Sequence, residues 1–323
     1  NPNCIKWGII GLGNMAEMMA TTIHGNRDSL VRAVASRNMK KAKAFASRHG
    51  NCKAYDNYKN LINDKSISID IIYISTPVKY HYQMIKDCLG GGINVLCEKP
   101  ITLNSKQLIE LISISKKNKC FLMEAMWMKC LPTFRKALDW INEGKIGNIK
   151  FIRANFYKKQ IIDSNLCIFN KDDSGGVLLD FGVYAISYMT NFIGGVPSIL
   201  KFSKQISSFG IDTDWNIYAE NNGIMAHVNI SSNFKSESKA SITGDKGSIE
   251  WSSQFNRTNT ISLYNSLGEI LDTCKYKYDY YGYEFQLREV IDCIREKNLE
   301  SKTVSLKQSL ETMIVIDKLL ENK

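Results

Sequence analysis

The spacing of apolar residues changes after residue 123. Before that point, short continuous apolar runs alternate with stretches in which apolar residues recur every three or four positions, which predicts alternating strands and helices. Continuous runs are typical of strands buried on both faces of a parallel sheet. The expected strands are 4–10, 30–35, 69–74, 94–98 and 120–123, and the expected helices are 15–24, 40–48, 56–62, 81–90 and 104–117. This order predicts a doubly wound α/β domain over residues 1–123, in which Asp56 is the N-cap of the third helix.

The second part of the chain has a different pattern. Apolar and polar residues alternate there, and glycine or polar turns separate the runs, as in an antiparallel or mixed sheet with one covered face. The expected strands are 149–157, 225–231, 239–243, 247–251 and 260–264, and the expected helices are 131–143, 177–192, 283–296 and 306–320. We therefore expect residues 124–323 to form an α+β domain on an open, mostly antiparallel sheet.

A glycine loop connects the first expected strand to the first helix. The sequence Gly-Leu-Gly-Asn-Met-Ala (residues 11–16) has the Gly-x-Gly-x-x-Ala spacing in the strand–loop–helix setting of a dinucleotide site. The first glycine permits a tight turn, and the second lets backbone N–H groups approach a pyrophosphate at the helix N-terminus. We predict that Gly11, Gly13, Asn14 and Met15 hold this group; the alternative is an ordinary glycine-rich turn.

The second expected strand ends in Ser36 and Arg37. An NAD-binding fold places an acid near this point for the ribose 2′-hydroxyl. A hydroxyl and a guanidinium can instead donate hydrogen bonds to a 2′-phosphate, so this pair favours NADP over NAD. The alternative is that Arg37 only stacks on the adenine, which would leave the protein able to use both cofactors.

Polar residues also follow the strand expected at 69–74. Ser75, Thr76 and Pro77 come directly after it, at the carboxyl edge where ligands bind in open α/β sheets. We predict that they line the phosphate and ribose of the cofactor, with an ordinary strand-to-helix turn as the alternative. His81 lies in the first turn of the next helix, where we expect it to cap the helix or to support the cofactor site rather than to react.

The strand that begins at Asn94 ends in Glu98, Lys99 and Pro100. Charged residues are costly to bury unless they are paired or used, and the proline ends the hydrogen-bonded ladder at the carboxyl edge. We therefore predict that Lys99 is the chemical centre of the protein and that Glu98 lines the same site. The alternative is a salt bridge at the end of a strand.

A second candidate group lies in the helix expected at 177–192. Asp180 and Tyr184 are four positions apart, so they share one helical face; Gly175 and Gly176 precede them, and Gly182 lies between them. A carboxylate beside a phenol can orient a substrate hydroxyl and transfer its proton. Taken alone, the motif also fits a helical aspartate beside a tyrosine that only packs.

Composition and charge narrow the class of protein. The chain has 323 residues, 44% of them apolar, with a net charge of +10 that comes from dispersed lysines and arginines rather than from a basic block. This distribution argues against a nucleic-acid partner and fits a lysine-rich surface. Nine scattered cysteines without a Cys-x-x-Cys motif indicate a reduced, cytoplasmic protein. We expect no secretory signal, no membrane segment and no metal site.

The motifs occur together in one order along the chain. The sequence resembles the glucose–fructose oxidoreductase, inositol dehydrogenase and MocA family from its first strand to its last helix. The stretch at 121–127, which ends in Trp127, and the Asp180 to Tyr184 motif look most like the dimeric dihydrodiol dehydrogenase branch. The motifs that carry the resemblance are the loop 11–16, Ser75–Thr76–Pro77, Cys97–Glu98–Lys99–Pro100, 144–147, 175–184 and 243–247.

The resemblance implies a Rossmann domain, followed by an α+β domain whose open sheet makes homodimer contacts. It implies NADP as cofactor, with NAD possible, and it adds Trp127 to the residues expected at the cofactor. It also implies that Lys99 and Tyr184 are the catalytic pair, supported by Asp180. A tyrosine stands where inositol dehydrogenases carry a histidine, which argues against inositol as substrate.

We therefore predict an NAD(P)-dependent oxidoreductase. Hydride would pass between the nicotinamide and the carbinol carbon of a sugar, a cyclic polyol or a dihydrodiol-like substrate, in a pocket built from loops such as 158–173. Either Tyr184 or Lys99 could be the immediate proton carrier. The alternative function is a regulatory protein that senses NAD(P) without turnover, because the same fold serves a regulator of galactose genes in this family.

Overall fold

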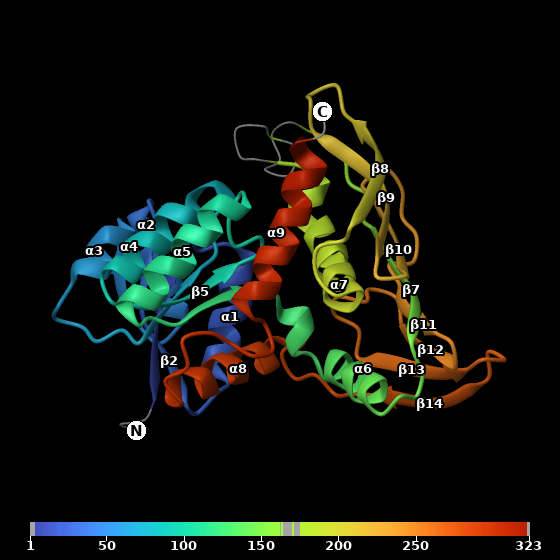
Figure 1. Ribbon diagram of the computed structural model, residues 1–323. Coiled ribbons are helices and arrows are strands. Elements are labelled where there is room, and N and C mark those ends of the chain that lie inside the picture. The colour runs from blue at the N-terminus through green and yellow to red at the C-terminus, as the bar shows by residue number, and fades with distance from the viewer. Residues whose placement is uncertain (1–3, 162, 164–169, 171–174, 322–323) are drawn as a thin grey trace. The chain divides into compact units, whose positions relative to one another are not determined.

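The protein folds into two compact units. The computed structural model describes residues 4–161, 163, 170 and 175–321 (Figure 1). The first unit is the chain up to Trp127 together with the later segment Asp279–Leu306, and the second is Met128–Tyr278 with the residues from Lys307 onward.

The segment Asp279–Leu306 belongs to the first unit, although the sequence pattern assigned all residues after 123 to one domain. Its helix α8 (Tyr283–Arg295) packs beside α1 (Asn14–His24), as Figure 1 shows. The backbone N–H of Leu122 donates to the carbonyl of Leu299 at 3.1 Å, so the segment also contacts the edge strand of the first sheet.

The first unit contains a six-stranded parallel sheet in the order β3-β2-β1-β4-β5-β6. This is the strand order of a dinucleotide-binding fold, so the predicted fold class is confirmed. The central strands are buried on both faces, as their continuous apolar runs indicated. The strands are β1 (Ile5–Ile10), β2 (Ser29–Ala35), β3 (Lys53–Tyr55), β4 (Ile71–Ile74), β5 (Asn94–Glu98) and β6 (Leu122–Ala125).

Asparagine side chains begin three helices of this unit. Asn38, Asn57 and Asn104 each accept a hydrogen bond from a backbone N–H in the first turn, of α2, α3 and α5 respectively. The prediction that Asp56 caps the third helix is therefore wrong, because the cap is its neighbour Asn57. Between β2 and β6 the unit contains the helices α2 (Met39–Arg48), α3 (Tyr58–Asn63), the short η1 (Val78–Tyr80), α4 (His81–Gly90) and α5 (Ser105–Asn118).

The second unit contains an eight-stranded sheet in the order β14-β13-β12-β11-β7-β10-β9-β8. Within the described part of this sheet, β7 and β10 form the one parallel pair, so the sheet is mostly antiparallel, as predicted. The strands are β7 (Ile149–Tyr157), β8 (Ile199–Ile206), β9 (Asp212–Asn221), β10 (Ile224–Ser231), β11 (Ala240–Gly244), β12 (Gly247–Trp251), β13 (Thr260–Asn265) and β14 (Ile270–Lys275).

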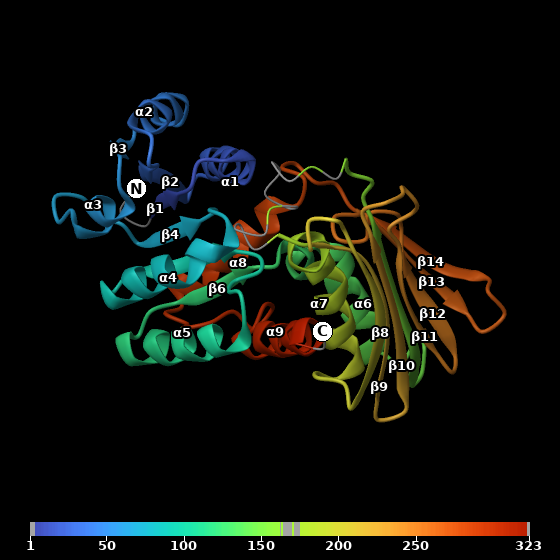
Figure 2. The ribbon, with the colours of Figure 1, turned by 90° about the horizontal axis from the view of Figure 1, so that it is seen from above.

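Helices cover one face of this sheet. Figure 2 shows α6 (Pro132–Asn142) and α7 (Val183–Ile193) on that face and, among the described residues, no helix on the other. The last helix, α9 (Leu306–Glu321), joins α7 through a 3.1 Å contact between the hydroxyls of Thr190 and Thr312. The sheet is therefore open on one side.

Four strands, β3, β8, β9 and β14, have no counterpart in the sequence prediction. In β8 and β14 most side chains are exposed or half-buried, so these strands lack the covered face that produces clear alternation. The three residues of β3 are too few to show a period. Neither explanation applies to β9, whose residues do alternate between buried and exposed.

Candidate functional site

Gly11 lies in a tight turn at the end of β1. Its φ is +86°, and a Cβ at this position would lie 2.8 Å from the carbonyl oxygen of Ser75, so the turn requires glycine. The Ser75 hydroxyl donates to the carbonyl of Gly11 at 2.8 Å. Ser75 therefore fastens the glycine loop to the end of β4, a contact that the sequence did not predict.

The N-terminus of α1 has room for an anion. The helix begins after Gly13, and none of the described side chains caps it, in contrast to the asparagine-capped α2, α3 and α5. A Cβ added at Gly13 would meet no atom within 4 Å, and both Gly13 and Asn14 are exposed. Uncapped N–H groups beside open space fit a pyrophosphate, which would fill the place of a side chain.

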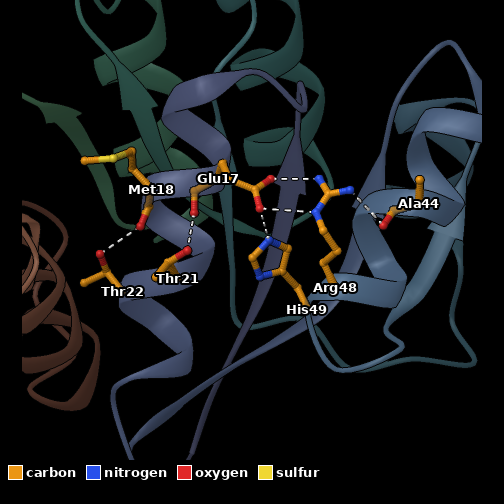
Figure 3. A network of polar contacts seen from close by, with 7 residues as sticks. All are labelled: Glu17, Met18, Thr21, Thr22, Ala44, Arg48 and His49. Carbon is orange, nitrogen blue, oxygen red and sulfur yellow. Dashed lines mark hydrogen bonds and ion pairs between the residues drawn. The ribbon is translucent and has the colours of Figure 1, made fainter.

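The acidic residue in the first turn of α1 is neutralised by its neighbours. Figure 3 shows the Glu17 carboxylate accepting hydrogen bonds at 2.9 Å from Arg48 and at 2.9 Å from His49, at the end of α2. The hydrogen bond from Arg48 is the main reason why the pKa of Glu17 is lowered. The contacts tie α1 to α2 and offset a charge that would otherwise repel phosphates at this helix N-terminus.

Ser36 and Arg37 lie in the turn from β2 to α2. The Ser36 backbone N–H donates to the carbonyl of Tyr55 at 3.1 Å, and the Ser36 hydroxyl accepts from the N–H of Asn38 at 3.3 Å. The guanidinium carbon of Arg37 lies 5.6 Å from the ring centroid of Tyr80. The turn thus presents a hydroxyl and an exposed guanidinium at the carboxyl end of β2, and their binding of a 2′-phosphate stays a prediction.

Lys99 directly follows β5, and its side chain is half-buried. Its neighbour Glu98 is buried and accepts a hydrogen bond from the hydroxyl of Tyr73 on β4 at 2.5 Å. Burial raises the pKa of Glu98, and burial followed by the charge of Glu98 raises the pKa of Tyr73. The sequence singled out Glu98 but not Tyr73.

His81 is buried between two backbone carbonyls. Its Nδ1 lies 2.9 Å from the oxygen of Pro100, and its Nε2 lies 2.7 Å from the oxygen of Thr76. Burial lowers the pKa of the imidazole, and the positive charge of Lys99 acts in the same direction. The side chain joins the turn after β4 to the turn after β5, which carry Pro77 and Lys99; its support of a cofactor site stays a prediction.

Trp127 stacks on Tyr283 of α8, with ring centroids 4.6 Å apart and an interplanar angle of 25°. The Tyr283 hydroxyl lies 3.7 Å from the sulfur of Met15. Two residues predicted at the cofactor, Met15 and Trp127, are thereby connected through a tyrosine that the sequence reading missed. The sequence analysis missed Tyr283 because the helix that contains it was assigned to the other domain.

In the second unit, Asp180 and Tyr184 lie on consecutive helical segments rather than on one α-helix. Asp180 belongs to the π-helical turn η5 (Leu178–Gly182), and Tyr184 lies in the first turn of α7. Tyr184 is 6% exposed, and its ring stacks on Phe156 with centroids 6.0 Å apart. A π-turn changes the spacing of side chains, and such turns are frequent at functional sites.

Asp212 of β9 fixes the start of this helical segment. Its carboxylate accepts from the N–H of Leu178 at 2.9 Å and from the indole of Trp215 at 2.7 Å. A Cβ at Gly176 would lie 2.1 Å from the same carboxylate, so the contact requires glycine. Burial raises the pKa of Asp212. The sequence analysis missed Asp212 because β9 itself was not predicted.

The structure brings the predicted cofactor residues of the first unit to one edge of its sheet. Asp180 and Tyr184 belong to the second unit, so their pairing with Lys99 stays a prediction. Most of the predicted substrate loop 158–173 lies outside the described residues. Within the described chain, no set of three metal-ligating side chains comes together, and no helix is long and apolar enough to span a membrane.

Comparison with known proteins matches both halves of the chain. Residues 5–126 match the family described as "Oxidoreductase family, NAD-binding Rossmann fold", and residues 134–250 match the "GFO/IDH/MocA C-terminal domain". The chain is 30% identical over 333 residues to trans-1,2-dihydrobenzene-1,2-diol dehydrogenase from Xenopus laevis, with 98% of this chain and 97% of that protein covered.

Two further relatives show the range of the group. The chain is 33% identical over 210 residues to D-xylose 1-dehydrogenase (NADP(+)) from Hypocrea jecorina, which covers 58% of this chain and 53% of the relative. It has the fold of a 3-ketoreductase from Actinomadura kijaniata, solved in complex with NADP and TDP-benzene, at a TM-score of 0.84, 22% identity, and coverage of 98% and 96%. The chain belongs to the GFO/IDH/MocA family of NAD(P)-dependent oxidoreductases.

Proposed function

We propose that this protein is an NADP-preferring dehydrogenase or reductase that acts on the CH–OH group of a sugar, a cyclic polyol or a dihydrodiol-like compound. The full-length similarity to a dihydrodiol dehydrogenase carries the proposal. The partial similarity to an NADP-dependent xylose dehydrogenase supports both the substrate class and the cofactor.

The residues of the first unit fit a bound NADP. The uncapped N-terminus of α1 and the open space at Gly13 would hold the pyrophosphate. Ser36 and Arg37 would donate to the 2′-phosphate, and the turn Ser75–Thr76–Pro77 would line the ribose. NAD, which has a hydroxyl in place of this phosphate, would lose the charge-assisted contacts.

The proposed chemistry needs one hydride transfer and one proton transfer. When bound, the nicotinamide would supply hydride-acceptor chemistry for the carbinol carbon, and its reduced form would supply hydride-donor chemistry for the carbonyl carbon. The Tyr184 phenol exchanges the hydroxyl proton, and the Lys99 ammonium stabilises the negative charge that develops on the oxygen. Asp180 orients the hydroxyl. The scheme works equally if Lys99, rather than Tyr184, is the group that directly exchanges the proton.

The first test is a fluorescence titration of the purified protein with NADPH and with NADH, followed by turnover assays. We expect tighter binding of NADPH, and reduction of NADP in the presence of a dihydrodiol or an aldose. Equal or tighter binding of NADH would reject the proposed preference. Tight NADPH binding without hydride exchange against a broad panel of alcohols and carbonyls would instead favour the sensor function.

We also propose a cytoplasmic homodimer that forms through the open face of the eight-stranded sheet. This face carries opposite charges, including Arg153 of β7 and Glu250 of β12, which are both exposed and are separated by strand β11. His227 and Tyr218 continue the row of Arg153 across β10 and β9. A mixed, self-complementary surface suits a two-fold contact. Sedimentation analysis of the wild type and of Arg153→Glu tests it, and a monomeric wild type would reject it.

A further inference from the structure

The ring of Tyr80 contacts two cations. Its centroid lies 5.6 Å from the guanidinium carbon of Arg37 and 5.1 Å from the ammonium nitrogen of Lys79. Tyr80 ends the short helix η1, where its backbone N–H donates to the carbonyl of Pro77 at 3.0 Å. The side chain is half-buried. A residue from the turn after β4 therefore restrains the arginine that follows β2.

The contact with Tyr80 restrains Arg37, the residue proposed to bind the 2′-phosphate of the cofactor. The backbone around Arg37 is fixed through Ser36, but the arginine side chain is long and exposed. An unrestrained arginine would lose rotamer freedom when it binds a phosphate. Contact with an aromatic face keeps the guanidinium near one position before the ligand arrives, which reduces that loss.

The surroundings favour an anion. The first turn of α2 carries Lys40 and Lys41. The first turn of α2 contains no acidic residue. A 2′-phosphate brought to Arg37 would therefore meet positive charge from α2 as well as from the guanidinium.

We propose that Tyr80 is a specificity-determining residue, which positions Arg37 for the 2′-phosphate of NADP. The inference rests on the proposed NADP preference. Tyr80 acts through Arg37 in this scheme, so its effect is confined to the cofactor that carries the phosphate. A ring that stacked on the adenine instead would contribute equally to both dinucleotides.

The test measures the dissociation constants of NADPH and NADH by fluorescence titration of Tyr80→Leu and Tyr80→Phe. For Tyr80→Leu we expect the NADPH constant to rise about two- to fivefold, the size of one exposed cation–π contact, while the NADH constant stays unchanged. Tyr80→Phe keeps the ring and should retain the preference. The matched control is Tyr82→Leu on α4. It removes a ring whose centroid lies 5.4 Å from the ammonium nitrogen of Lys86.

A double variant separates positioning from direct contact. In an Arg37→Ala background, Tyr80→Leu should cause no further loss of NADPH affinity, because the ring then has no guanidinium to hold. A loss of the same size in that background, or an equal loss for NADPH and NADH, would overturn the inference. Thermal unfolding of each variant checks that the fold is intact.

The outcomes also separate this inference from the proposed function. If the wild type binds NADPH and NADH equally, the NADP preference itself fails. If the wild type prefers NADPH and Tyr80→Leu keeps that preference in full, the role of Tyr80 fails alone.

Discussion

The hydroxyl of Tyr73 lies 2.5 Å from the carboxylate of Glu98, and both side chains are buried at the carboxyl edge of the first sheet. The two residues come from adjacent parallel strands, β4 and β5. Since Glu98 precedes Lys99, the tyrosine anchors the residue beside the proposed chemical centre. The contact gives Glu98 a supporting role within the sheet, in addition to the cofactor contact that the sequence suggested.

Tyr73→Phe tests this anchor. The variant leaves the buried Glu98 without its phenolic donor, so we expect the free energy of unfolding to fall by about 1–3 kcal/mol. Urea denaturation measures the change. Tyr55→Phe is the control, because Tyr55 donates to Asp64 in a more exposed setting and should cost less. Equal effects of the two substitutions would contradict a special role for the Tyr73 pair.

The two glycines of the loop should respond differently to alanine. Gly11→Ala forces a side chain into a left-handed turn and against Ser75, and we expect it to destabilise the protein by about 1–3 kcal/mol. Gly13→Ala adds a methyl group to open space in an extended backbone, so stability should be kept while NADPH affinity falls. Thermal unfolding and NADPH titration measure both. Undiminished NADPH binding by Gly13→Ala would place the pyrophosphate elsewhere.

Lys99→Ala and Tyr184→Phe test the proposed catalytic pair. Each should lower kcat by about a hundred- to ten-thousand-fold on a true substrate, because each removes a group that acts in proton transfer or charge stabilisation. NADPH affinity should change little. Steady-state kinetics and titration measure the two effects. Near-normal turnover by either variant would remove that residue from the mechanism.

His81 should make stability depend on pH. Burial lowers its pKa in the folded state below the unfolded value of about 6.5. Its contribution is therefore present above about pH 6.5 and is lost as the pH falls through the lower folded pKa, because the unfolded state then binds the proton more readily. His81→Gln cannot titrate, so its unfolding temperature should fall less than that of the wild type between pH 7.5 and 5.

The control for His81 is His227→Gln. The pKa of His227 is also lowered by burial, but its side chain is only half-buried and bonds to Asn216, so its substitution should flatten the pH profile less. Parallel profiles of the wild type and His81→Gln would show that the imidazole does not titrate differently in the folded protein.

The sequence predicted best those features that depend on local chemistry. The sequence predicted the glycine loop, the buried parallel strands and the polar residues at their carboxyl ends. Turn geometry and burial restrict the residue types that can occupy such positions. Glu98 was found in this way. Tyr73 was not, because in the run Ile-Ile-Tyr-Ile nothing indicates that its hydroxyl meets a carboxylate 25 positions later.

Other features depend on contacts between distant segments. Asp212 holds the turn that carries Asp180, and Tyr283 lies between Met15 and Trp127, yet each is far from its partners in sequence. The assignment of Asp279–Leu306 to the first unit also follows from packing, since a helical pattern does not tell which unit the helix covers.

That returning segment determines when the first unit can be completed during synthesis. The ribosome releases β1 to β6 first, but α8 and the Leu299 contact to β6 come only after the whole eight-stranded sheet has been made. Until then the nascent dinucleotide domain lacks the helix that packs against α1 and the Leu299 contact to the outer edge of β6, and exposed edges and apolar surfaces favour aggregation. A fragment that ends at Trp127 would remain in this state, whereas one that joins residues 4–127 to 279–306 would contain every part of the unit that the structure describes.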